Sequence, residues 1–178
     1  MKTDQARKYA SEAFHFESDD ETPNNSRLPL VVYRGVVPDQ AMGDAATWFE
    51  QTFADNGWSD GWRNGIYPFL HFHTGTHEVL GIARGRATVE FGGAKGRALT
   101  VEAGDVVVLP AGTGHKRLDA SADLLVVGAY PCNGRFDQKR PGQVDREAAS
   151  RAVAAVPLPE RDPVSGSTGP VIELWRGR

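Results

Sequence analysis

Between residues 65 and 130 the chain is broken every few residues by glycine, and few folds accommodate such punctuation. The stretches between the glycines are rich in β-branched residues and are short, which is typical of strands rather than helices. No helical segments alternate with them, so a parallel sheet with crossover helices is not expected. The pattern predicts an all-β fold, an antiparallel sandwich or barrel. The expected strands are 66–73, 78–84, 86–91, 97–101, 105–109 and 123–130.

The segments on either side of this region have other patterns. The polar residues 1–27 predict an arm or loop with a short strand near residues 14–16, and the β-branched run 30–37 predicts a strand. We divide the chain, as one domain, into four parts. These are an N-terminal arm and strand (1–37), a peripheral helix (38–57), the β-rich core (58–140) and a C-terminal helix and tail (141–178).

One or two helices are expected at the periphery of the β core. The first would begin at an Asp39 cap, and Trp58 and Trp62 would lie in the loop that follows it. Residues 143–155 predict a second helix, and residues 171–175 predict a last strand. The apolar stripe of the first helix, at three- and four-residue spacing, consists of Met42, Ala45, Ala46, Phe49 and Phe53.

Length and charge narrow the class of protein. The 178 residues suffice for one full-sized core, and 20 glycines and 11 prolines favour many turns. The net charge is −3 and basic clusters are short, so the basic surface of a nucleic-acid-binding protein is absent. A nucleic-acid partner is therefore not expected.

Other features bear on the cellular location. Residues 1–8 lead into no apolar stretch, and no run approaches the roughly 18 apolar residues of a membrane span. The single cysteine, Cys132, cannot form an intrachain disulfide, which fits a reducing compartment. It also has no base near it in sequence, so we interpret it as a packed thiol rather than a nucleophile. We expect a soluble, cytoplasmic protein without a membrane partner.

Four of the five histidines fall between residues 71 and 115, and three of them suit a metal site. On a strand, His71 and His73 point to one face, about 7 Å apart. The chain then turns, so Glu78 on the returning strand can reach the same point, and His115 after a glycine-rich loop can complete the set. Imidazoles with one carboxylate suit one divalent ion of iron, manganese, nickel, copper or zinc, and do not suit calcium or magnesium.

The spacing of these residues resembles the two motifs of the cupins. Gly65, His71, His73, Glu78 and Gly85 match the first motif, and Gly104, Pro110, Gly112 and His115 match the second. Asp119 stands where the family usually has an asparagine, a position that is usually structural. The amino-acid sequence at residues 77–81 and 110–116 resembles that of the bacterial, single-domain YjlB-like cupins in particular. This resemblance implies a double-stranded β-helix, or jelly roll, with the metal in the barrel mouth and with no assigned substrate.

The remaining histidines have plainer interpretations. His77 is adjacent to Glu78, so strand alternation turns it to the opposite face, and we expect a turn or subunit contact. His15 lies between two phenylalanines in the polar arm and is interpreted as structural. The alternative for the metal set itself is a metal-free scaffold that retains its histidines.

Two functions from different classes follow from a metal site. Four protein ligands on a six-coordinate metal leave two positions for a substrate or dioxygen, which indicates a metalloenzyme acting on a small molecule. Cupin chemistry of this type includes dioxygenation, oxidation, decarboxylation and isomerisation, and the fold alone selects none of these reactions. The alternative is a non-catalytic cupin that binds or senses a small molecule through its metal.

Arg117 and the flanking segments support two further expectations. If the strand after His115 is regular, Arg117 points inward and binds a substrate carboxylate beside the metal. If the chain bends there, Arg117 turns to solvent or pairs with Asp119. A homodimer is expected because the flanking segments carry aromatics such as Phe16 and Trp175 that look exposed.

Overall fold

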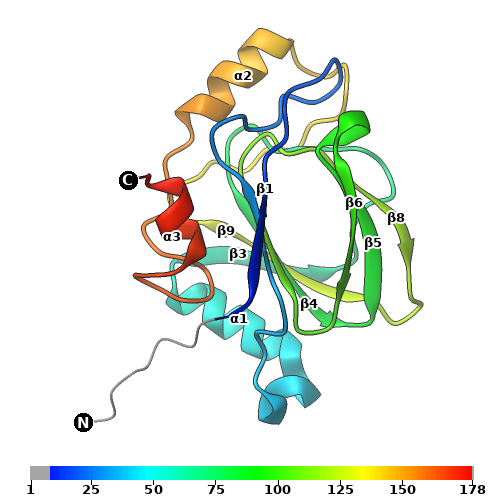
Figure 1. The fold of residues 1–178 in the computed structure, drawn as a ribbon, viewed down its shortest axis with the longest axis vertical. Helices are drawn as coiled ribbons and strands as arrows, with labels where there is room; N and C mark the ends of the chain where they lie inside the picture. Colours follow the sequence, from blue (N-terminus) through cyan, green and yellow to red (C-terminus); the bar gives the residue numbers. More distant parts are fainter. Residues whose placement is uncertain (1–8, 178) are drawn as a thin grey trace.

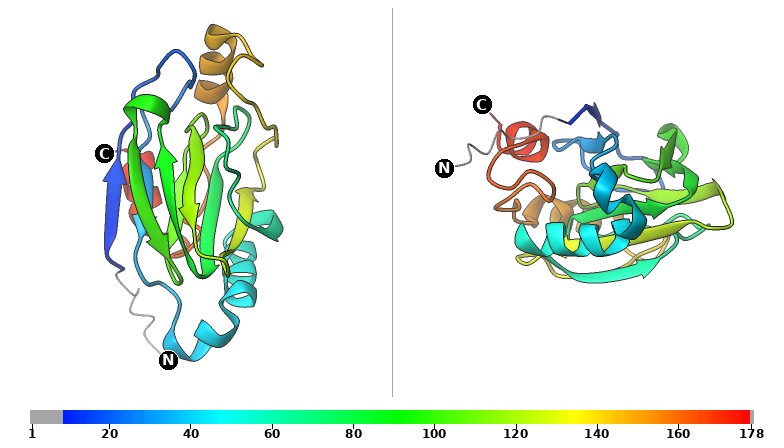
Figure 2. Two further views of the ribbon diagram at one scale, coloured as in Figure 1. Left: turned by 90° about the vertical axis from the view of Figure 1, so that its right-hand side faces the viewer. Right: turned by 90° about the horizontal axis from the view of Figure 1, so that it is seen from below.

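The computed structural model describes residues 9–177, which form two antiparallel sheets that face each other (Figures 1 and 2). One sheet has six strands in the order β1-β2-β7-β4-β9-β3, and the other has three in the order β6-β5-β8. This is the expected jelly roll. The strands are β1 (Ser11–Phe14), β2 (Leu30–Tyr33), β3 (Trp58–Asn64), β4 (Glu78–Arg84), β5 (Arg86–Phe91), β6 (Arg97–Glu102), β7 (Val106–Leu109), β8 (His115–Ala120) and β9 (Leu125–Pro131).

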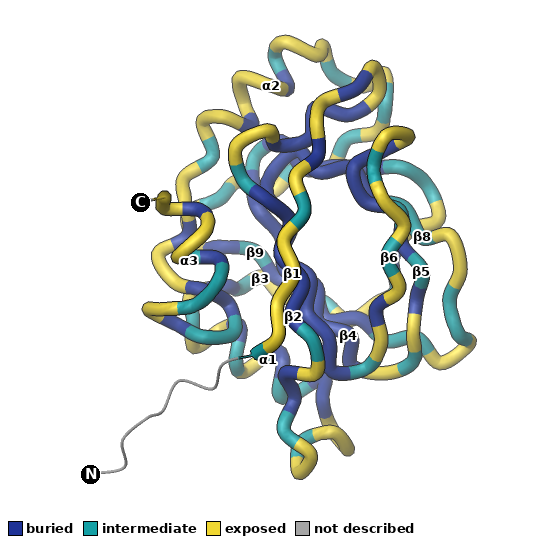
Figure 3. The backbone as a smooth tube through the Cα atoms, in the orientation of Figure 1, coloured by how far each residue is buried: buried dark blue, intermediate teal, exposed yellow. Residues whose placement is uncertain are grey.

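The central strands of the larger sheet are buried on both faces. In Figure 3, β2 and β4 are almost wholly dark blue, whereas the edge strand β1 is largely exposed. Alternate residues of these strands therefore serve two cores. Leu80 and Ile82 of β4 face the three-stranded sheet, in a cluster with Val89 and Phe91. Val79 faces outward into a second cluster beneath the helices.

Helix α1 (Ala45–Asp55) covers that outer face of the six-stranded sheet. Phe49 and Phe53 are fully buried, as the stripe predicted, and a Cβ on Gly81 would come within 2.7 Å of the Phe49 ring. The expected cap is wrong. Residues 39–44 form a separate 3₁₀ turn, η1 (Asp39–Asp44), and the Asp44 side chain accepts from the Thr47 N–H to begin α1. Met42 lies in that turn and is 39% exposed, so it is not part of the buried stripe.

Several segments differ from the sequence prediction. Trp58 and Trp62 lie on strand β3, which pairs with β9, and not in a loop. Residues 66–73 form no strand, because their backbone makes only isolated bridges at His71 and Phe72. Residues 170–175 form helix α3 (Pro170–Trp175) in place of a last strand, since Pro170 occupies the first helical turn, where its missing N–H costs nothing. With α1 and α2 (Arg146–Ala155), residues 9–177 therefore contain three α-helices.

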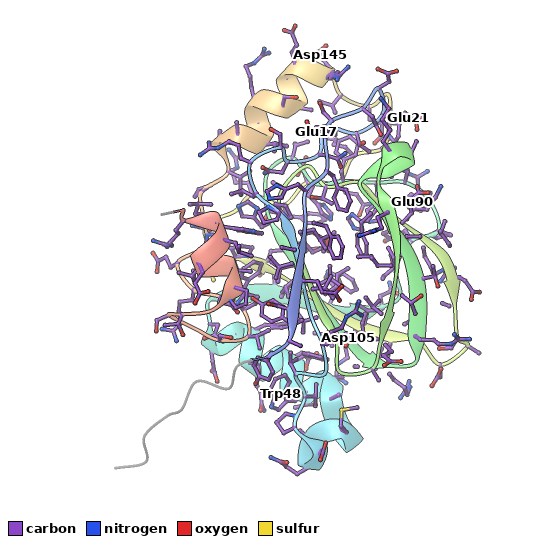
Figure 4. All side chains as sticks on the ribbon, in the orientation of Figure 1. Glu17, Glu21, Trp48, Glu90, Asp105 and Asp145 are labelled. Atoms are coloured by element: carbon purple, nitrogen blue, oxygen red, sulfur yellow. The ribbon has the colours of Figure 1, made fainter. Side chains whose placement is uncertain are left out.

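The C-terminal segment folds back onto the outer core. Helix α2 is capped by Asp145, labelled in Figure 4, whose carboxylate accepts from the Ala148 N–H. Trp175 is 5% exposed and Phe16 is 8% exposed, so these aromatics are buried within the chain and are not the exposed surface expected for a homodimer. The homodimer itself stays a prediction, which light scattering at micromolar concentration would test.

No helix in residues 9–177 is long and apolar enough to cross a membrane. Residues 1–8, used to judge a secretory signal, lie outside the described chain.

A buried network joins this segment to β2. The Tyr33 hydroxyl donates to the Asp162 carboxylate, and Asp162 is fully buried. Burial, together with the charge of Asp162, raises the pKa of Tyr33 well above its ordinary value of 10.0.

This network predicts a loss of stability at high pH. Above pH 10 the unfolded chain loses the Tyr33 proton and the native chain keeps it, so the contribution of this group is complete below pH 10 and declines above it. The free energy of unfolding should fall by up to about 1.4 kcal/mol per pH unit from this group. In urea unfolding between pH 9 and 11, Tyr33→Phe should show a shallower decline than the wild type. Parallel declines would contradict the prediction.

Candidate metal centre

His71 and His115 are held side by side by the backbone. Each donates its N–H to the carbonyl of the other, at 3.2 and 3.0 Å, and the two rings are 4.0 Å apart between centroids. His115 is the first residue of β8, while His71 lies in the irregular segment after β3. The two motif segments thus meet at this bridge.

His73 and Glu78 complete the cluster. The His73 ring centroid is 5.9 Å from that of His71 and 5.8 Å from that of His115. Glu78 opens β4, and its Oε2 is 3.2 Å from His73 Nε2 and 3.3 Å from His115 Nε2. The three histidines each offer a ligand atom within 4.8 Å of the others, and all four side chains are buried. The structure therefore brings together all four residues that the sequence nominated.

The backbone orients all three imidazoles in the same way. His71 Nδ1 lies 3.0 Å from the Phe69 carbonyl, His115 Nδ1 lies 3.0 Å from the Thr113 carbonyl, and His73 Nδ1 bonds to the Asp137 carbonyl. A carbonyl only accepts, so each Nδ1 carries a proton, and each ring turns its Nε2 away from that carbonyl, those of His73 and His115 toward the Glu78 carboxylate. Metal-ligating histidines are ordinarily fixed by such outer bonds. The donor set thus fits a divalent transition ion.

The charges in the site also suit a cation. Burial alone would raise the pKa of the Glu78 carboxyl, but His73 and His115 outweigh it and hold the pKa below its usual value. Burial and the neighbouring His115 lower the pKa of His71 to about 3, so His71 is neutral. Burial lowers the pKa of His73, yet the charge and hydrogen bond of Glu78 outweigh it, and the pKa is raised. Glu78 is thus an anion that favours positive charge at the centre of the cluster. Binding of a metal ion there would release a proton.

A short segment after β9, here called the strap (residues 135–139), fixes His73 from outside the sheets. The Asp137 carboxylate accepts from the Thr74 N–H, the Thr74 hydroxyl and the Gly75 N–H. Lys139 and Phe72 exchange backbone hydrogen bonds. Gly75 is required here, because a Cβ would lie 2.2 Å from the Arg135 carbonyl oxygen. No motif within residues 135–139 indicated that this segment belongs to the site.

The polar N-terminal arm supports the glycine loop before His115. Asn24, which is 2% exposed, accepts from the Gly114 N–H and donates to the Gly92 carbonyl. Asn25 donates to the Ala111 carbonyl. Residues 22–25, within the predicted arm or loop, are therefore a buried part of the site's framework. Amide side chains are well suited to this role, because they satisfy backbone groups that no strand pairs.

A cavity of about 260 Å³ opens onto the four residues. Sequence reasoning missed its aromatic walls. Trp62 of β3 donates through Nε1 to the Tyr130 hydroxyl of β9, at 2.8 Å. Burial, followed by the charge of Glu78, raises the pKa of Tyr130, so this hydroxyl keeps its proton at neutral pH. In the sequence, the available signal for Tyr130 was strand alternation, which places it on the same face of the strand as Gly128. The other lining residues are Arg63, Asn64, Gly65, Ile66, Tyr67, Leu80, Phe136 and Gln138.

The other candidate residues lie outside this cluster. His77 is buried on the opposite face, where it stacks on Trp175, accepts from the Ala111 N–H and contacts the Pro157 carbonyl, so it packs within the chain and is not a subunit contact. Cys132 is exposed and lies 3.3 Å from the Ser59 hydroxyl, which corrects its interpretation as a packed thiol. His15 is exposed on the arm.

Arg117 lies on β8 at the edge of the site. It is half-buried, its N–H donates to the Tyr67 carbonyl, and a Cβ on Gly65 would lie 3.9 Å from its Nη1. Gly65 lines the cavity, but Arg117 is not among the described residues that do so. Its role in binding a substrate stays a prediction.

Two facing antiparallel sheets with convergent histidines between them are the architecture of the cupin class of proteins. No family model matches the chain. The uncharacterized protein YjlB of Bacillus subtilis (strain 168) is 38% identical over 165 residues, covering 93% of this chain and 96% of that protein. The chain belongs to the YjlB-like cupins.

Solved structures with a similar fold are more distant. A mutant of Bacillus subtilis oxalate decarboxylase is 17% identical, with 70% of this chain and 29% of that chain covered and a TM-score of 0.37. Acireductone dioxygenase from Bacillus anthracis, solved with a cadmium ion in its active centre, is 19% identical, with 55% and 66% covered and a TM-score of 0.36. Pumpkin seed globulin is 20% identical, with 54% and 31% covered and a TM-score of 0.38. This chain spans less than a third of the decarboxylase and globulin chains, and such scores carry no argument about activity.

Proposed function

We propose that this protein is a metal-dependent enzyme that acts on a small molecule in the barrel mouth. His71, His73, Glu78 and His115 would hold one divalent iron, manganese, nickel, copper or zinc ion. The observation that carries the proposal is the common orientation of the three rings, each with Nδ1 bonded to a carbonyl, so that their other nitrogens converge beside Glu78. A bound transition metal would supply Lewis acidity and, for iron, manganese or copper, one-electron chemistry.

A polar group beyond the four ligands favours catalysis over simple binding. The Tyr130 hydroxyl lines the cavity and accepts from Trp62, so its own proton is free to be donated toward the site. A protein that only binds or senses a ligand has no need of such a proton donor. Tyr130 would hold a proton at its hydroxyl oxygen, and the enclosing side chains would restrict access of water. Oxidation, dioxygenation, decarboxylation and isomerisation are all compatible with this arrangement.

The proposal is tested by metal analysis of the purified protein, followed by turnover assays. We expect about one transition-metal ion per chain. Oxygen uptake and product formation would then be measured against carboxylic acids, thiols and catechols. Uptake that depends on iron and on a substrate supports an oxygenase, and turnover without uptake supports a lyase or isomerase. Stoichiometric binding without turnover, unchanged in Tyr130→Phe, would instead support the binding or sensing role.

One version of the proposal, in which the substrate carries a carboxylate, rests on Arg117. If Arg117 pairs with a substrate carboxylate, Arg117→Leu should weaken binding of small carboxylates to the metal-loaded protein by about ten- to a hundredfold. Titration calorimetry with the wild type and the variant measures this. Equal affinities would show that Arg117 has no part in the site.

A further inference from the structure

Two large aromatic side chains remain exposed at the cavity although each contacts a histidine of the metal cluster. Tyr67 is 45% exposed and its ring is 5.4 Å from that of His71. Phe136 is 60% exposed and its ring is 5.4 Å from that of His73. Both line the cavity. Aromatic surface left exposed beside a polar, buried cluster is typical of the lining of a ligand site.

Each of these rings is supported from behind. Tyr67 stacks on Phe69 with ring centroids 4.7 Å apart, and the Arg140 guanidinium lies 3.6 Å from the Phe69 ring centroid. Phe136 sits on the strap and packs against Tyr130, with centroids 5.0 Å apart. Both rings are therefore held in place before a ligand arrives, so little side-chain entropy would be lost on binding.

The size and charge of the cavity limit the ligand further. Its volume of about 260 Å³ lies just below the roughly 300–1,000 Å³ of pockets for drug-sized molecules, which fits a molecule with a single ring. Arg63 is on its wall, but its guanidinium is held by both carboxylate oxygens of Glu50, at 2.7 and 2.8 Å, and by the Thr47 hydroxyl. The charge of Arg63 is therefore already matched by a carboxylate of this chain. Apolar faces dominate recognition away from the metal.

We propose that the ligand of this site carries one flat aromatic ring, which packs against Tyr67 and Phe136 while oxygen donors on the ring reach the metal. This inference rests on the proposed metal function. Stacked and edge-to-face aromatic pairs exceed ordinary apolar contact by an amount that corresponds to roughly three- to tenfold in affinity. A saturated ring of the same size should bind less tightly by that factor.

Two hydroxamic acids with the same metal-chelating group test the proposal. Benzohydroxamic acid has a flat ring, and cyclohexanecarbohydroxamic acid has a puckered one. Their dissociation constants would be measured by calorimetry on the zinc-loaded protein, which avoids redox chemistry. We expect the benzo compound to bind roughly three- to tenfold more tightly to the wild type, and Phe136→Leu and Tyr67→Leu each to reduce that ratio. Leu174→Ala, which removes an equally exposed apolar side chain on α3, should keep it.

The outcomes separate this inference from the function on which it rests. If both hydroxamic acids bind the wild type with equal affinity, the metal site stands and the aromatic preference is wrong. If the preference is present but survives in both leucine variants, the assignment to Tyr67 and Phe136 is wrong. If the protein takes up no zinc, the metal function itself fails and the inference fails with it. If zinc is bound but neither compound binds, the inference alone is wrong. Metal content and thermal unfolding of each variant confirm that the fold and the ion are retained.

Discussion

Replacing His73 with alanine should reduce the metal content from about one ion per chain to a small fraction. His73 Nε2 faces Glu78 Oε2 at 3.2 Å, at the centre of the cluster, and its loss leaves three of the four expected ligands. Changes to residues that merely support a ligand already lower metal affinity by about 10- to 100-fold, so removing a ligand should cost at least as much. Metal analysis after dialysis against a weak chelator measures the effect.

The exposed histidine of the arm provides the matched control. His15→Ala removes an imidazole that lies outside the cluster and should leave the metal content unchanged. Circular dichroism of both variants would show that the sheets are intact. Full metal occupancy in the double variant His71→Ala/His73→Ala would refute the assignment of these ligands.

The second large effect concerns stability. Asp162→Ala should lower the free energy of unfolding by about 4 kcal/mol. The carboxylate is fully buried and accepts from the N–H groups of Val164, Ser165 and Val171 and from the Tyr33 hydroxyl. Without it, these donors are left without partners between β2 and the C-terminal segment, and each buried unsatisfied donor is costly. Urea unfolding at pH 7.5 measures the change.

Two further variants separate the causes of that loss. Asp55→Ala removes an exposed carboxylate at the end of α1 and should change the free energy of unfolding by less than about 0.5 kcal/mol. Asp162→Asn keeps the shape and one accepting oxygen, so its loss should be smaller than that of alanine. A loss below about 1 kcal/mol in Asp162→Ala would mean that the network does not hold the C-terminal segment.

The local sequence pattern was sufficient to predict a strand where that strand is buried on at least one face. Strands β4 and β5 have the bounds expected, 78–84 and 86–91, because their apolar residues lie within each strand and Gly85 and Gly92 follow directly after the two strands. The four residues of the candidate metal site could also be predicted from the sequence. Glu78 comes to His73 because only four residues separate them in the chain, and the cupin-like spacing indicated His115.

Where the conformation of a segment is fixed by residues distant in the sequence, the same kind of pattern predicted the wrong structure. The apolar run 66–73 reads as a strand, yet its backbone makes only isolated bridges to His115 and Lys139 and single hydrogen bonds with Gly112 and Arg117. Residues 171–175 include the β-branched and aromatic residues typical of strands, but Asp162 accepts the Val171 N–H and thereby holds the start of a helix. In both cases the deciding hydrogen bonds join residues that hydrophobic periodicity does not relate.

The sequence by itself determined the two-sheet fold, the four candidate ligands and the class of metal that they suit. Only the tertiary structure decided the surroundings of that cluster: the strap that fixes His73, the buried residues 22–25 that support the loop before His115, and the aromatic walls of the cavity. The physical reason is that hydrophobic periodicity and ligand spacing are encoded over a few residues. The partners of unpaired backbone groups, and the side chains that meet across a cavity, are fixed only when strands far apart in the chain pack together.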